Sequence, residues 1–135
     1  MKTYTAQMIE DELYSMVRGF CLPISGGVYK RATRPYNSKE EDCVVAFLTG
    51  GAKQVQEGTV LINIYVPDII AGDGQAYKNT TRCAEIEKSL VGFDTLLNTK
   101  SDIYFKTEDM IKTIEEEDIN QHFVSLKLRF KVLTN

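Results

Sequence analysis

Two segments of the chain carry apolar residues at helical spacing. In the first segment these positions are Ile9, Leu13, Met16, Val17 and Phe20. The pattern predicts an amphipathic helix over residues 5–19, with Thr5 as its N-cap and Gly19 as its end. In the second segment the apolar positions are Cys83, Ile86, Leu90, Phe93 and Leu97. They predict a second amphipathic helix, capped by Thr80 or Thr81.

Two other segments alternate between apolar and polar residues, which is the pattern of a strand with one buried face. These segments are residues 59–66 and 124–132. Shorter strands are predicted at residues 28–33, 43–48 and 103–105. The run at 43–48 is apolar throughout, so we expect both of its faces to be covered. Residues 110–114 either pair with the C-terminal strand across the sequence EEEDIN or form a short helix.

The connections complete the expected architecture. The sequence RPYNSKEED, in which Pro35 ends a strand, is interpreted as a crossover between two strands. TGGAK at 49–53 is predicted to be a turn, and residues 67–81 a long loop. Together these elements predict a single α+β domain spanning residues 1–135. Its core is a single-layer, mostly antiparallel sheet of about five strands, with two amphipathic helices packed on one face.

Composition narrows the classes of function. The chain has 135 residues, a net charge of −3 and a pI of about 5.2, which argues against broad, non-specific nucleic-acid binding. No apolar run approaches the roughly 20 residues of a membrane span, and no signal-peptide block is present at the N-terminus. The three cysteines have no pairing spacing, so we expect reduced, core-packed thiols in a reducing compartment.

Candidate catalytic or ligand-binding residues are few. His122 is the only histidine, and it has no expected acid–nucleophile or metal-ligand partners, so a surface or sheet histidine is the favoured interpretation. The glycine pairs match neither a dinucleotide-binding nor a P-loop spacing. Asp68 and Asp73 flank the long loop without calcium-loop spacing. We therefore expect no catalytic residues, no cofactor and no metal.

The remaining charge features are an acidic run and a basic strand face. The acidic run is Glu115, Glu116, Glu117 and Asp118, and the basic face is Lys127, Arg129 and Lys131. Charged side chains on a sheet keep its edges soluble, which is one interpretation. The other is that the acidic run forms a channel or interface surface, and this alternative stays open.

With these elements in place, the chain resembles the tail-completion and tail-terminator family of long-tailed phages and prophages. The resemblance spans nearly the whole length. It lies in the helix DELYSMVRGF, the strands GVYKRATRP, EDCVVAFLTGG and QVQEGTVLINIYVPD, the helix CAEIEKSLVGF and the closing strand HFVSLKLRFKVL. The match is one of element order and loose pattern.

The resemblance implies a structural virion protein without a catalytic site. Such subunits form a ring, commonly of six, at the head-proximal end of the tail tube, where they contact tail-tube and neck proteins and DNA passes without specific binding. The expected locations are the virion tail and, during assembly, the cytoplasm of the host bacterium, with no membrane partner. The alternatives are a phage head-closure or neck protein, or a small bacterial adaptor that binds a peptide or polar ligand.

Overall fold

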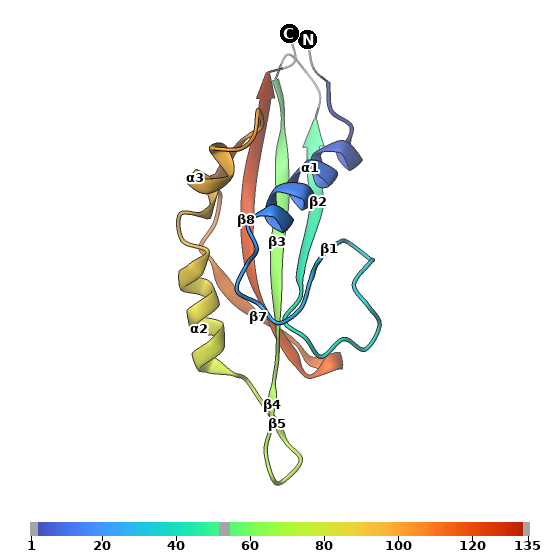
Figure 1. Ribbon diagram of the computed structural model, residues 1–135, viewed down its shortest axis with the longest axis vertical. Helices are drawn as coiled ribbons and strands as arrows, with labels where there is room; N and C mark the ends of the chain where they lie inside the picture. Colours follow the sequence, from blue (N-terminus) through green and yellow to red (C-terminus); the bar gives the residue numbers. More distant parts are fainter. Residues whose placement is uncertain (1–2, 52–54, 134–135) are drawn as a thin grey trace.

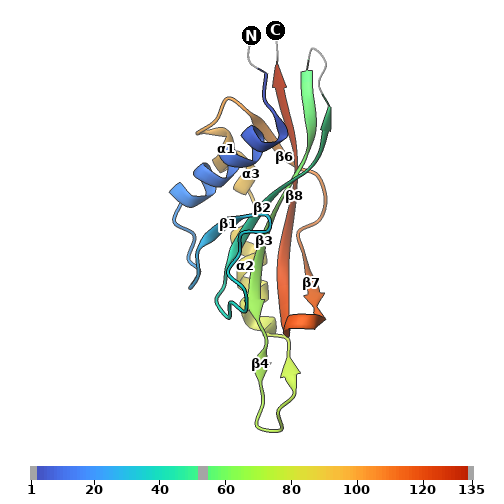
Figure 2. The same cartoon turned by 90° about the vertical axis from the view of Figure 1, so that its right-hand side faces the viewer.

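The computed structural model describes residues 3–51 and 55–133. Within these residues, six strands form a mixed sheet in the order β1-β2-β3-β8-β6, with β7 also paired to β8, and three α-helices lie on one face of it (Figures 1 and 2). The architecture confirms the predicted α+β class. The sheet has one strand more than expected, and the expected second helix is two helices.

Strands β3 (Val55–Pro67) and β8 (Gln121–Leu133) form the centre of the sheet and pair antiparallel along their whole lengths. The alternation predicted for both strands is confirmed. The buried side chains facing the helices are Val60, Ile62, Ile64 and Val66 from β3 and Val124, Leu126, Leu128, Phe130 and Val132 from β8. Since alternate residues point to opposite faces, the remaining positions face away from the helices.

Helix α1 (Ala6–Gly19) has the predicted bounds and cap. The hydroxyl of Thr5 accepts a hydrogen bond from the Met8 backbone N–H at 3.1 Å, and the helix buries Ile9, Leu13 and Val17 against the sheet. A carboxylate of the same helix binds a backbone donor at the sheet edge, because Glu10 Oε2 accepts a hydrogen bond from the Phe47 N–H at 2.9 Å.

The second predicted helix is divided into α2 (Thr80–Ser89) and α3 (Phe93–Asn98). The apolar spacing continues across the break, but Gly92 has φ +80°, which interrupts the helical backbone. The predicted caps, Thr80 and Thr81, are wrong. Asn79 is the N-cap, and its side-chain oxygen accepts a hydrogen bond from the Arg82 N–H at 3.2 Å.

Strand β1 (Val28–Lys30) pairs parallel to β2 (Cys43–Gly51), so the predicted crossover between two strands is confirmed. It spans residues 31–42, because β1 ends at Lys30 and not at Pro35 as predicted. Asp42 is buried at its end and accepts hydrogen bonds from Arg34 Nε at 2.8 Å, from the Ser38 hydroxyl and from the Gly27 N–H. Burial raises the pKa of Asp42, but these three hydrogen bonds outweigh burial and hold the pKa below its ordinary value. The charged crossover is therefore an internally bonded structural element.

The prediction that β2 is covered on both faces is wrong for its second half. Ala46 is buried, but Leu48 is 46% exposed on the face away from the helices. The strand also continues through Thr49, Gly50 and Gly51, the first part of the predicted turn, after a register shift between Phe47 and Thr49. The rest of the expected turn, residues 52–53, lies outside the described residues.

The C-terminal hairpin is confirmed, and the strand alternative holds for residues 112–114, whereas residues 110 and 111 precede the strand. β6 (Tyr104–Thr107) and β7 (Lys112–Glu116) pair with successive halves of β8, and a 3-10 turn (Glu117–Ile119) connects β7 to β8. Asn120, with φ 53°, completes this turn. β6 and β7 thus occupy the same edge of the sheet, separated by residues 108–111.

The predicted long loop at residues 67–81 is largely a β-hairpin. Strands β4 (Ile69–Ile70) and β5 (Ala76–Tyr77) pair antiparallel around a turn that contains Gly74, whose φ is +83°. We call residues 69–77 the arm. It projects beyond the end of the main sheet, at the opposite end of the molecule from both termini (Figures 1 and 2).

Candidate functional site

The sheet face opposite the helices (Figure 2) is called here the open face. It carries an apolar groove of about 300 Å³. Leu61 and Phe123 form part of its lining, together with the more exposed Leu48, Met110 and Ile114. Lys112, Lys127 and Asp109 add charge to the lining, and Lys112 Nζ lies 3.8 Å from Asp109 Oδ2. An apolar surface with a polar rim is typical of a protein contact site.

The strand register explains how this groove forms. Ile114 of β7 lies directly opposite Phe123 of β8, and opposed residues share a face of a sheet. The Phe123 ring also contacts the Tyr65 ring at a centroid distance of 5.3 Å. The groove could not be predicted from the sequence, because Ile114, Phe123 and Leu48 come from three separate segments and only the strand pairing brings them together.

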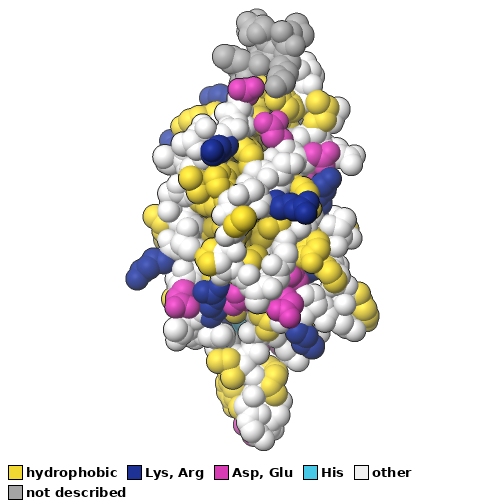
Figure 3. Space-filling model, viewed as in Figure 1, with side chains coloured by type: hydrophobic (Ala, Val, Ile, Leu, Met, Phe, Trp, Pro, Cys, Tyr) yellow, Lys and Arg dark blue, Asp and Glu magenta, His cyan; other side chains and the backbone are white. Residues whose placement is uncertain are grey.

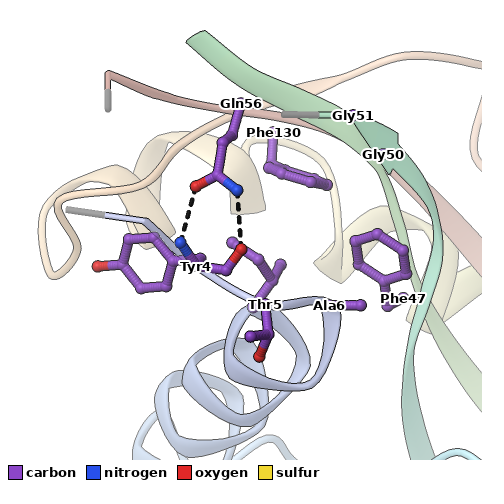
Figure 4. Close-up of a pocket in the computed structure, with 9 residues that line it drawn as sticks. Tyr4, Thr5, Ala6, Phe47, Gly50, Gly51, Gln56 and Phe130 are labelled. Atoms are coloured by element: carbon purple, nitrogen blue, oxygen red, sulfur yellow. Dashed lines mark hydrogen bonds between the residues drawn. The ribbon is translucent and has the colours of Figure 1, made fainter. Parts of the chain in front are cut away.

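A second hollow, of about 250 Å³, lies between the N-terminal end of α1 and the strands β2, β3 and β8 (Figure 4). Phe47 and Phe130 line it, with their ring centroids 5.8 Å apart. The Gln56 side chain accepts a hydrogen bond from the Tyr4 N–H at 2.8 Å and donates one to the Tyr4 carbonyl at 2.7 Å. This paired contact fixes the segment that precedes α1 and closes one side of the hollow.

The acidic run is not confined to the connection between two strands that the sequence EEEDIN predicts. Glu115 and Glu116 belong to β7, opposite His122 and Gln121, whereas Glu117 and Asp118 lie in the exposed 3-10 turn. Successive strand residues point to opposite faces, so Glu115 and Glu116 diverge. The structure therefore keeps only Glu117 and Asp118 together at the tip of the hairpin.

His122 lies in the sheet, as predicted, but it has a carboxylate partner that the sequence did not predict. His122 lies in β8, and its Nδ1 is 2.7 Å from Asp68 Oδ1 at the base of the arm. Asp73 is engaged elsewhere, since it accepts hydrogen bonds from the Gln75 N–H and from the Tyr77 hydroxyl. The two flanking aspartates thus bond to different partners. Among the described residues, no group of three or more histidine, cysteine or carboxylate side chains is arranged to hold a metal.

The cysteines differ in their surroundings. Cys43 and Cys83 are buried, and burial raises the pKa of the Cys43 thiol to about 12 and also raises that of Cys83. Thiols of this kind are poor nucleophiles at neutral pH. The expectation that all three cysteines are core residues is wrong for Cys21, which is exposed just after α1 with φ 51°.

The basic positions of β8 lie on the open face, as predicted. Arg129 and Lys131 are exposed, and Arg129 Nη2 donates a hydrogen bond to Glu57 Oε1 at 2.9 Å. Lys127 is half-buried because it lines the groove. One of the glycine pairs, Gly26 and Gly27, has a structural role, since the Gly27 N–H donates a hydrogen bond to Asp42 Oδ1 at 3.1 Å.

A comparison with models of known protein families and a comparison with curated proteins each found no match to this chain. In the part of the chain that the structure describes, no helix is long and apolar enough to cross a membrane. The function is therefore argued from the fold and from the two surfaces described above.

Proposed function

We propose that the protein is a structural virion subunit of the phage tail-terminator or tail-completion type. Such a subunit assembles into a ring, commonly of six copies, at the head-proximal end of the tail tube. The observation that carries the proposal is the groove on the open face, where Leu48, Met110 and Ile114 are exposed at 46%, 80% and 37%. Contiguous apolar surface of this kind is typically covered by a protein partner.

The order of elements supports the same proposal. An N-terminal helix, three strands of the main sheet, a helical segment and the closing strands occur in the order on which the resemblance to the family rests, with the arm inserted between β3 and α2. In this proposal the neighbours of the ring are tail-tube and neck proteins, and the subunit works in the virion tail after assembly in the host bacterial cytoplasm. A head-closure or neck protein is a variant of the proposal with the same ring-forming character.

DNA passes through such a ring without specific binding. The acidic character of the chain, with net charge −3, supports this part of the proposal because a negative wall repels phosphate. Glu117 and Asp118, exposed together on the hairpin turn, are the acids placed to contribute to such a wall.

The hollow shown in Figure 4 favours a second candidate function. A small adaptor binds an apolar peptide side chain in a concave, mostly apolar site, and the hollow lined by Phe47 and Phe130 has this character. The adaptor needs no ring. The two proposals therefore differ in the oligomeric state that they require.

Negative-stain microscopy and sedimentation velocity of the purified protein, at rising concentration, distinguish the two candidates. Closed rings of uniform diameter support the tail-terminator proposal. A particle that remains a monomer or a dimer at every concentration, in both low and physiological salt, would overturn the proposal and leave the adaptor as the better candidate.

A further inference from the structure

The arm exposes more apolar surface than its size would suggest. Ile69, Ile70 and Tyr77 are 52%, 60% and 52% exposed, and hydrophobic side chains are visible on the lower projection in Figure 3. Ile69 pairs with Tyr77, so these two side chains share one face of the hairpin, and Ile70 lies on the other. Both faces of the arm therefore present apolar side chains to solvent.

A hairpin of two strands is marginally stable in water unless its apolar face is packed against something. The arm has short strands, and it projects away from the body of its own subunit (Figure 2). Its base is well anchored, because Asp68 bonds to His122 and the Asp68 N–H donates to the Asn120 carbonyl at 3.0 Å. A firm base and an exposed apolar end are the features of a docking element.

We propose that the arm of one subunit docks into the open-face groove of a second copy of the chain. Apolar residues of the arm, such as Ile70, would cover Met110 and Ile114 in the groove of the neighbour. The charges are complementary, since the turn of the arm carries Asp73 and the groove is lined by Lys112 and Lys127, with Asp109 as its one acid.

The arm and the groove are different surfaces of the same chain, so the contact is head-to-tail. Each subunit offers one arm and one groove, and repetition of such a contact closes into a ring when the rotation allows it. The inference rests on the proposed function, because it names the surfaces through which the ring would assemble. Each subunit would use two distinct surfaces, the arm toward one neighbour and the groove toward the other.

The test uses two variants that each disable one surface. Ile70→Asp places a charge on the arm, and Ile114→Asp places one in the groove. Val91→Asp is the matched control, because Val91 is 72% exposed but lies between α2 and α3, outside both surfaces. Met110→Asp is a second groove variant, at an 80% exposed position outside the strands, in case Ile114→Asp fails to fold.

Sedimentation velocity of the full chain gives the readout, with circular dichroism as the check on folding. We expect either surface variant to weaken self-association at least roughly tenfold, as for a central contact residue, while the Val91 control assembles like the parent. An equimolar mixture of Ile70→Asp and Ile114→Asp should form a dimer and nothing larger. Only one intact arm and one intact groove can meet in that mixture.

Three results would overturn the inference. They differ in whether the proposed function is overturned with it. If the parent assembles and both surface variants assemble equally well, the ring uses other surfaces and the proposed function stands. If each variant is monomeric but their mixture also stays monomeric, the two residues do not belong to one arm–groove contact. If the parent itself stays monomeric, the proposed function fails as well.

Discussion

Gly58 offers a sharp test of how closely β2 and β3 approach. It lies opposite Gly50 in β2 and Phe130 in β8, next to the register shift after Phe47. A Cβ atom added at Gly58 would lie 2.0 Å from the Thr49 carbonyl oxygen and 2.5 Å from the Gly50 Cα. Both obstructing atoms belong to the backbone and cannot rotate away, so the two strands must separate to admit a methyl group.

The expected magnitude follows from this geometry. Overpacking a well-packed site costs typically about 1–3 kcal/mol, and Gly58→Ala should lie at the upper end because the clash is with backbone. Gly51→Ala is the matched control, since an added Cβ there has nothing within 4 Å. Replacing an unobstructed strand glycine stabilises by about 0.4–1 kcal/mol through the unfolded chain. The two alanine variants should therefore differ by roughly 2–4 kcal/mol.

Urea and thermal unfolding, followed by circular dichroism at one fixed protein concentration, measure this difference. For a chain of this length each kcal/mol corresponds to roughly 4 °C in Tm. Gly58→Ala should melt well below the parent, and Gly51→Ala at or above it. Equal stabilities for the two variants would refute the close approach of the strands at Thr49.

Leu128 is fully buried, so Leu128→Ala should lower the free energy of unfolding by about 2–5 kcal/mol in a chemical denaturation experiment. Lys127→Ala, on the other face of β8, should lower it by about 0.5 kcal/mol or less. The reverse order would contradict the β8 register. The pKa of Asp42 is lower in the folded than in the unfolded chain, so its ionised form stabilises the fold above about pH 4. This stability is lost as the pH falls through the folded-state pKa. The unfolding free energy of Asp42→Asn should therefore depend less on acid than that of the parent. A chelator should leave Tm unchanged, whereas a fall that zinc reverses would reveal a metal site. Gln at all of 115–118 should preserve the fold and let an assembled ring retain duplex DNA that the parent ring excludes. Continued exclusion would mean that these acids are only solvated charges of β7 and the 3-10 turn.

Local patterns predicted most of the secondary structure. The alternation in residues 59–66 and 124–132 identified the buried faces of β3 and β8, because a period of two depends only on the pleat of a strand. Thr5 was recognisable as a cap, since its hydroxyl bonds within its own first turn. The break at Gly92 was missed because the apolar spacing of the second helical segment continues unchanged on both sides of it.

The sequence by itself determined which residues form the core and that helices cover one face of a sheet, since apolar periodicity is a local property. Only the tertiary structure decided which polar and apolar residues meet. Strand pairing placed Ile114 beside Phe123 and separated Glu115 from Glu116. The pairing of Ile69 with Tyr77 likewise turned an apparent loop into the arm. These surfaces depend on register between distant segments, and register is set by the packing of the whole sheet against its helices.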